Sequence, residues 1–328
     1  MLPAFLTTIF FSISAVCAQR TSKALGGVAA NFWRLILATF FLAIWAHTMG
    51  QGISGGAFPL FLVSGVLGFG LGDIALYQAL PRLGSRLSIL LVHCLATPFA
   101  ATTEWVWMET TMKRMEILGA VLILFGVALA LAPGKHLDIP RRTFWIGVAC
   151  GIIAALGQAL GAVLSGHASR LDLRAGTPVD GITAAYQRIL AGVVVAALFW
   201  LAVKARGRKG ERTGENSESD NDKGSAARVS RILPPTSLWP WVAMNALTGP
   251  AIGVACYQWA LMKEKSGVVL PIVALTPLVI IPFSRFVEGE RPRKRSLFGG
   301  VIAVAGVFIL TGGAEMLKKL ISLGGTFD

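Results

Sequence analysis

The sequence has few charged residues for its length. Of its 328 residues, 14% are charged and 54% are hydrophobic, and the mean hydropathy is +0.66. A soluble globular domain carries about 25% charged residues. This shortage of charge argues against a soluble enzyme, and it also argues against disorder outside one short stretch.

Motifs for catalysis and metal binding are also missing. The four cysteines lie too far apart for a disulfide framework or a CxxC metal site. The sequence contains no Walker A motif, no GxSxG and no HExxH, and its four histidines are scattered. We therefore expect neither an enzyme nor a bound metal or cofactor.

The net charge of +13 has a different meaning here from its meaning on a soluble protein. On a soluble domain it would suggest binding to nucleic acid. In this chain the basic residues fall between long apolar runs, which is where membrane proteins carry them. We expect the partner to be a lipid bilayer and not nucleic acid.

Apolar stretches long enough to cross a bilayer follow one another along most of the chain. A crossing helix needs about 20 mostly apolar residues. Backbone groups in lipid must be satisfied within the segment, so these stretches are expected to be helices. The predicted spans are 3–18, 27–46, 57–78, 86–107, 115–132, 144–164, 182–203, 239–262, 266–287 and 296–313. They predict an all-α, multi-pass protein of a cell membrane or a bacterial inner membrane.

The two halves of the sequence resemble each other. Three anchors recur in order: Arg34 and Arg188, Tyr77-Gln78 and Tyr257-Gln258, and Glu109 and Glu290. The spacing between the first two anchors is longer in the second half by about the length of the charged, polar segment 205–236, which we predict to be a disordered linker. The predicted repeats are 3–132 and 144–313.

Each repeat holds five predicted spans, and five is an odd number. The second copy must therefore enter the membrane from the side opposite to the first. This is an inverted-topology repeat around a central site, an architecture that is typical of secondary transporters.

The order and duplication of these motifs resemble the EamA-type transporters of the drug/metabolite transporter superfamily. The features that carry the resemblance are the arginine in the second span of each half, Gly72-Asp73 before Tyr77, a proline in the fourth span (Pro98, Pro277), and the glycines of the fifth. The resemblance implies ten helices, a central cavity, and export or exchange of a small metabolite. It does not imply which metabolite.

Polar side chains inside a bilayer are costly, so each is a candidate for binding substrate. The candidates are Arg34, Asp73, Tyr77, Gln78, His93, Gln158, Arg188, Asn245, Tyr257 and Gln258. Most of these residues also have a structural interpretation. The arginines either neutralise an anionic solute or stabilise helix contacts and gates. For the arginines, the sequence favours the second, structural or gating role. Asp73 either binds an amine or a proton, or it pairs with Arg34.

The sequence therefore predicts a secondary transporter that moves a small polar or amphipathic metabolite by alternating access. The two arginines with Asp73 suggest an amino acid. Proton coupling would involve Asp73, Glu104 or His93. The alternatives are a membrane receptor or assembly scaffold that transports nothing, and a channel. The side on which the termini lie, and whether the protein is a monomer or a homodimer, stay undetermined.

Overall fold

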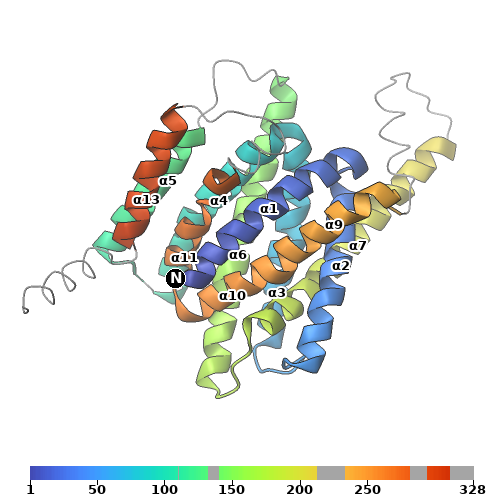
Figure 1. Ribbon diagram of the computed structural model, residues 1–328. Helices are drawn as coiled ribbons and strands as arrows, with labels where there is room; N and C mark the ends of the chain where they lie inside the picture. The colour runs from blue at the N-terminus through green and yellow to red at the C-terminus, as the bar shows by residue number, and fades with distance from the viewer. Residues whose placement is uncertain (110, 132–139, 213–232, 281–293, 311–328) are drawn as a thin grey trace, which may run out of the picture.

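The computed structural model describes residues 1–109, 111–131, 140–212, 233–280 and 294–310 (Figure 1). Within these ranges the regular elements are all helical, in agreement with the predicted all-α class. The α-helices are α1 (Leu2–Leu25), α2 (Gly27–Thr48), α3 (Phe58–Gly65), α4 (Asp73–Met108), α5 (Arg114–Leu131), α6 (Arg141–Arg174), α7 (Gly181–Arg212), α9 (Trp239–Ala246), α10 (Ile252–Lys263), α11 (Ser266–Val273) and α13 (Lys294–Leu310). The remaining elements are the π-helical segments η1 (Val66–Gly72) and η3 (Leu247–Ala251) and the 3-10 turn η2 (Thr236–Leu238).

Several helices are long and apolar enough to cross a membrane. In the part of the chain that the structure describes, six qualify by length and composition, and two shorter apolar helices, Ser266–Ile280 and Phe298–Leu310, accompany them. Large apolar side chains remain exposed along these helices, as expected where lipid rather than water surrounds the protein.

The predicted spans fall on helices, and the differences lie at their ends. Helix α6 continues to Arg174, past the predicted end at 164, and α7 continues to Arg212, inside the predicted linker 205–236. Lys and Arg are good helix formers, so a helix can extend beyond the apolar stretch that crosses the bilayer. Parts of these predictions lie outside the described residues, namely 132, 213–232, 281–287 and 311–313.

A break at Gly84 separates the third predicted span from the fourth. Gly84 has φ 81° and ψ 164°, a conformation that residues with a Cβ rarely adopt. The chain is helical on both sides of this residue, so α4 consists of two helices joined at a kink. Pro98, the proline of the fourth predicted span, lies inside the second of them.

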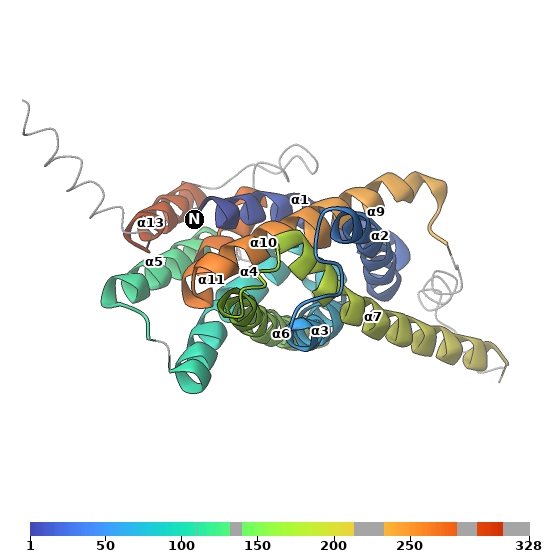
Figure 2. The same ribbon diagram turned by 90° about the horizontal axis from the view of Figure 1, so that it is seen from below.

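The helices pack in pairs that cross the boundary between the two halves. Helix α2 packs against α7, and α5 packs against α13. Figures 1 and 2 show the α5–α13 pair at one end of the molecule and α2 with α7 at the other. Helix α1 packs against α9 and α10, while α6 packs against α3, η1 and α4.

Glycines bring the helices around the polar cavity, which is described below, very close together. A Cβ built on Gly27 would lie 2.0 Å from the carbonyl oxygen of Tyr77, and one on Gly157 would lie 2.6 Å from that of Leu67. Small residues at membrane helix contacts allow such close approach. The backbone of α2 therefore lies directly against α4, and α6 against η1.

Candidate functional site: a polar cavity between the two halves

A partly open cavity of about 80 Å³ lies between helices of both halves. A water-sized probe needs only about 10–15 Å³ of such space, so the cavity has room for several waters or a small solute. Seven of the ten candidate residues line it: Arg34, Asp73, Tyr77, His93, Gln158, Arg188 and Tyr257. The rest of the lining is mostly apolar or small, such as Phe11, Leu76 and Gly249.

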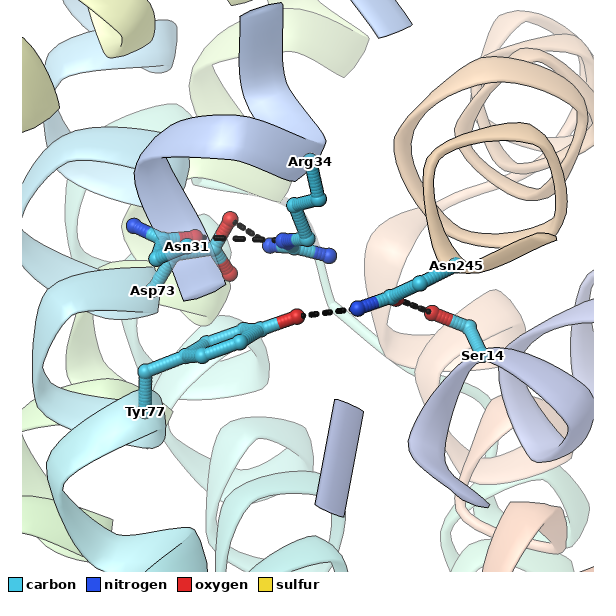
Figure 3. A network of polar contacts seen from close by, with 6 residues as sticks. All are labelled: Ser14, Asn31, Arg34, Asp73, Tyr77 and Asn245. Atoms are coloured by element: carbon cyan, nitrogen blue, oxygen red, sulfur yellow. Dashed lines mark hydrogen bonds and ion pairs between the residues drawn. The ribbon is translucent and has the colours of Figure 1, made fainter. Parts of the chain in front are cut away.

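The first half of the chain contributes a network of polar contacts (Figure 3). Arg34 forms an ion pair with Asp73, and its Nε donates a hydrogen bond of 3.1 Å to Asn31 Oδ1. The guanidinium also lies over the Tyr77 ring, 4.7 Å from its centroid. Both charges are thus taken from water, but each has a partner of opposite sign.

The hydroxyl of Tyr77 is held from the opposite half. Asn245 Nδ2 donates to this hydroxyl at 2.8 Å, and Ser14 Oγ donates to Asn245 Oδ1 at 2.8 Å (Figure 3). All three residues are buried. This chain of hydrogen bonds connects α4, α9 and α1 at one side of the cavity.

The second half provides the same residue types with fewer partners. Arg188 donates from Nη1 to Gln258 Oε1 at 3.0 Å, and Ser165 Oγ donates to the same oxygen at 3.1 Å. The Nε of Arg188 and the Nε2 of Gln258 are buried without a hydrogen-bond partner. The Tyr257 hydroxyl lies near Gln158 but completes no hydrogen bond.

Two π-helical segments place these residues. Segment η1 ends immediately before Asp73, and η3 ends shortly before Tyr257. A π-helical turn widens the helix locally and is frequent at functional sites. A Cβ on Gly68 in η1 would lie 3.0 Å from Arg188 Nη2, and one on Gly249 in η3 would lie 3.2 Å from Arg34 Nη1. Each arginine therefore reaches the π-helical segment of the other half.

The remaining candidates differ in their positions. His93 lines the cavity and stacks on Phe11 with ring centroids 6.1 Å apart. Asn245 and Gln258 lie behind the lining and hold residues that belong to it. Gln78 is outside the lining, where its Oε1 accepts a hydrogen bond of 2.9 Å from Arg82 on the same helix.

Sequence reasoning did not single out Ser14, Asn31, Ser165 or Gly249 as parts of the site. Asn31 precedes Arg34 by one helical turn, a spacing that places the two side chains on one face. Serines are too common in membrane helices to give a signal by themselves. Among the described residues, no group of three or more His, Cys, Asp or Glu side chains is placed to hold a metal ion.

Comparison with known proteins defines the class of this chain. A sequence model of the EamA-like transporter family matches residues 1–132 and 225–312. The chain therefore belongs to the EamA-like transporter family, and it is a multi-pass membrane protein of the transporter class rather than an enzyme. The resemblance to EamA-type transporters is confirmed.

Two curated relatives are named as probable flippase subunits. The chain is 36% identical over 74 residues to the probable 4-amino-4-deoxy-L-arabinose-phosphoundecaprenol flippase subunit ArnE of Pseudomonas paraeruginosa (strain DSM 24068 / PA7). It is 35% identical over 74 residues to the corresponding subunit of Pseudomonas aeruginosa (strain UCBPP-PA14). Each match covers 23% of this chain and spans 62% of the relative.

A solved protein crystal structure shares the fold. It covers 96% of this chain and 97% of its own chain, with a TM-score of 0.67 and 16% sequence identity. This likeness extends over nearly all of both chains, and at this identity it concerns the fold alone.

Proposed function

We propose that this chain is a secondary transporter that moves a small polar or amphipathic metabolite by alternating access, as an exporter or exchanger. The observation that carries the proposal is the cavity, whose ionisable and aromatic side chains come from both halves. Binding sites for small organic molecules typically combine an apolar lining with a few convergent polar groups. An amino acid is one solute whose charges match this lining.

The helix contacts support two inverted five-helix repeats, 3–132 and 144–313. Helices α2 and α7, the second of each repeat, run antiparallel. Phe32 near the start of α2 stacks on Trp200 late in α7 with centroids 4.7 Å apart. At the other end, the Gln51 backbone N–H donates to Thr183 Oγ1 at 3.3 Å. Equivalent helices that run in opposite directions are expected of an inverted repeat.

A pair of glycines supports the same alignment. Gly27 and Gly181 each lie seven residues before the arginine of their half, Arg34 and Arg188. A Cβ on either would be too close to a carbonyl oxygen of its own half, at 2.0 Å for Gly27 and 2.6 Å for Gly181. In both halves the second helix therefore begins against the helix that carries the tyrosine.

The character of the cavity favours transport over a scaffold. A scaffold that only holds partners needs a well-packed apolar centre, whereas here two arginines and an aspartate face a central space. Charged groups within a membrane are costly and usually mark a substrate or ion pathway. The names of the relatives extend the candidate solutes from an amino acid to the head group of a lipid-linked amino sugar.

Flux measurements test this proposal. The full-length protein in proteoliposomes is expected to show saturable counterflow of a solute from a panel of amino acids, nucleosides, sugar phosphates and quaternary amines. Flux that rises linearly with solute concentration would indicate a channel. Absence of flux for the whole panel would favour a receptor or scaffold.

The source of energy is tested with the same assay. The sequence holds no nucleotide-binding motif, so we propose that a gradient of protons or of the solute drives transport. If protons are coupled through Asp73, the Asp73→Asn variant loses the pH dependence of flux. Unchanged pH dependence would remove Asp73 from that role and leave Glu104 and His93.

A further inference from the structure

The two arginines of the cavity occupy equivalent positions but have unequal partners. Arg34 is paired with Asp73 and Asn31, so its charge is compensated within the protein. Arg188 has no carboxylate within ion-pair distance among the residues that the structure describes, and a neutral amide oxygen accepts its Nη1 proton. Its side chain is nevertheless only 3% exposed.

The charges that line the cavity do not cancel. The lining contains two guanidinium groups and one carboxylate, and the carboxylate is already engaged by Arg34. Another buried acid, Glu104, accepts backbone N–H groups of Ser266 and Gly267 at 3.0 and 3.1 Å with its two oxygens. One positive charge on the cavity wall therefore lacks a counterion among the residues that the structure describes.

Hydrogen-bond donors without acceptors surround this charge. The Nε–H of Arg188 and the hydroxyl of Tyr257 are both buried, both belong to residues that line the cavity, and neither completes a hydrogen bond with the residues that the structure describes. Buried donors in native structures are nearly always satisfied, so an unsatisfied set is unusual. One donor on the uncompensated guanidinium and a second donor on Tyr257 are the chemistry that an anion requires.

The surroundings of Arg188 keep its guanidinium in place. Gln258 Oε1 accepts hydrogen bonds from both Arg188 and Ser165, which fixes one edge of the Arg188 guanidinium. The ring of Phe69 lies 5.4 Å from the guanidinium carbon and covers another side. Gln258 and Ser165 thus act as positioning residues, and the buried Nε has no hydrogen-bond partner among the described residues.

We propose that the transported solute carries an anionic group, a carboxylate or a phosphate, which binds between the guanidinium of Arg188 and the hydroxyl of Tyr257. This inference rests on the proposed transport function and names its substrate class. The planar guanidinium matches either group through two parallel N–H···O bonds. We exclude Arg34 as the anion site because its positive charge is already paired with the Asp73 carboxylate.

Anion-dependent thermal stability of the purified full-length protein tests the proposal. Acetate and inorganic phosphate are compared with chloride at equal ionic strength, so that the two arms separate a carboxylate site from a phosphate site. One of the two anions is expected to raise the Tm of the wild type. Arg188→Gln is expected to lose this increase, whereas Lys263→Gln, which removes an exposed cation, retains it.

Two milder variants keep the test decisive if Arg188→Gln does not fold. Tyr257→Phe removes one donor and is expected to reduce the anion response, while Arg188→Lys keeps the charge and is expected to retain part of it. An equal response in wild type and all Arg188 variants would overturn the proposal. The absence of a response to either anion in the wild type would overturn it as well.

Flux in proteoliposomes separates this proposal from the proposed function. Saturable transport restricted to cationic or neutral solutes, and unaffected by Arg188→Lys, would leave the transporter standing and overturn the anion site. Anion binding that depends on Arg188 without flux of any solute would support the site and overturn the transporter. Transport of an anionic or zwitterionic solute that is lost in Arg188→Gln supports both.

Discussion

The two halves of this protein place the same residue types around one cavity and satisfy them differently. In the first half, Arg34 has Asp73, and the Tyr77 hydroxyl has Asn245. In the second half, and within the described residues, Arg188 has the Gln258 amide oxygen as its one hydrogen-bond acceptor, and the Tyr257 hydroxyl completes no hydrogen bond. Two arginines of similar sequence context therefore differ in their partners, because among the described residues only Arg34 has a carboxylate within ion-pair distance.

The largest expected difference between the halves follows from removing each arginine. Arg34→Met leaves the buried Asp73 carboxylate without a counterion, and we expect a loss of about 3–5 kcal/mol in the free energy of unfolding. Arg188→Met removes an uncompensated charge and is expected to be near neutral or stabilising. Equilibrium unfolding in mixed micelles measures both.

A second substitution controls the prediction for Arg34. The double variant Arg34→Met/Asp73→Asn removes both charges and is expected to recover most of the lost stability. Equal losses for Arg34→Met and Arg188→Met would contradict the difference between the halves.

Steric substitutions at the equivalent glycines are expected to have the next largest effect. Gly27→Ala places a Cβ 2.0 Å from the Tyr77 carbonyl oxygen, and Gly181→Ala places one 2.6 Å from that of Ala255. Overpacking of this kind costs up to about 3 kcal/mol, and we expect the larger loss for Gly27. Gly300→Ala is the control, because a Cβ there meets nothing within 4 Å. Thermal unfolding that ranks Gly300→Ala with the other two would refute this interpretation.

A smaller effect is expected at the contact between the halves made by Glu104. Its carboxylate accepts the N–H groups of Ser266 and Gly267 at the start of α11. Glu104→Gln removes the charge from these buried hydrogen bonds and is expected to cost about 1.5 kcal/mol. Glu116→Gln, at an accessible contact with the backbone of Lys113, is expected to cost about 0.5 kcal/mol or less. A reversed order in unfolding measurements would show that the Glu104 contact is not stabilising.

The smallest difference is expected between the two tyrosines. Tyr77→Phe leaves Asn245 Nδ2 without an acceptor and is expected to cost about 0.6–1 kcal/mol, the usual value of a hydrogen bond between membrane helices. Tyr257→Phe removes a hydroxyl without a partner, so the free energy of unfolding is expected to stay nearly unchanged. Unfolding of both variants without added anions decides this. Equal losses would indicate that Tyr257 does have a partner in the protein.

Much of the fold was predictable because the constraints act locally along the chain. Apolar stretches of membrane length placed the helices, and even the break between the third and fourth spans agreed with a glycine at position 84. The predicted helix ends were less accurate. The charged residues after Phe199 are compatible both with a helix that continues into water and with a chain that becomes irregular there. The π-helical turns had no clear signal, because glycine and proline also occur in ordinary membrane helices.

The candidate site was predictable in its residues and not in its connections. Intramembrane polar side chains are rare enough to be listed from the sequence, and seven of the ten proved to line one cavity. Gln78 resembles Gln258 in sequence, yet it binds Arg82 on its own helix while Gln258 binds Arg188 across to α7. Which neighbour a side chain meets depends on helix rotation, and hydrophobic patterning does not set that rotation to within one residue.

By itself, the sequence indicated a membrane protein of helical spans and predicted two related halves, because composition and repetition are properties of the chain. The tertiary structure decided which arginine is neutralised and which is left with free donors beside the cavity. That outcome depends on side chains from distant segments, such as Asn245 against Tyr77, coming within 3 Å of each other. Only the packing of the two halves against one another brings those segments together.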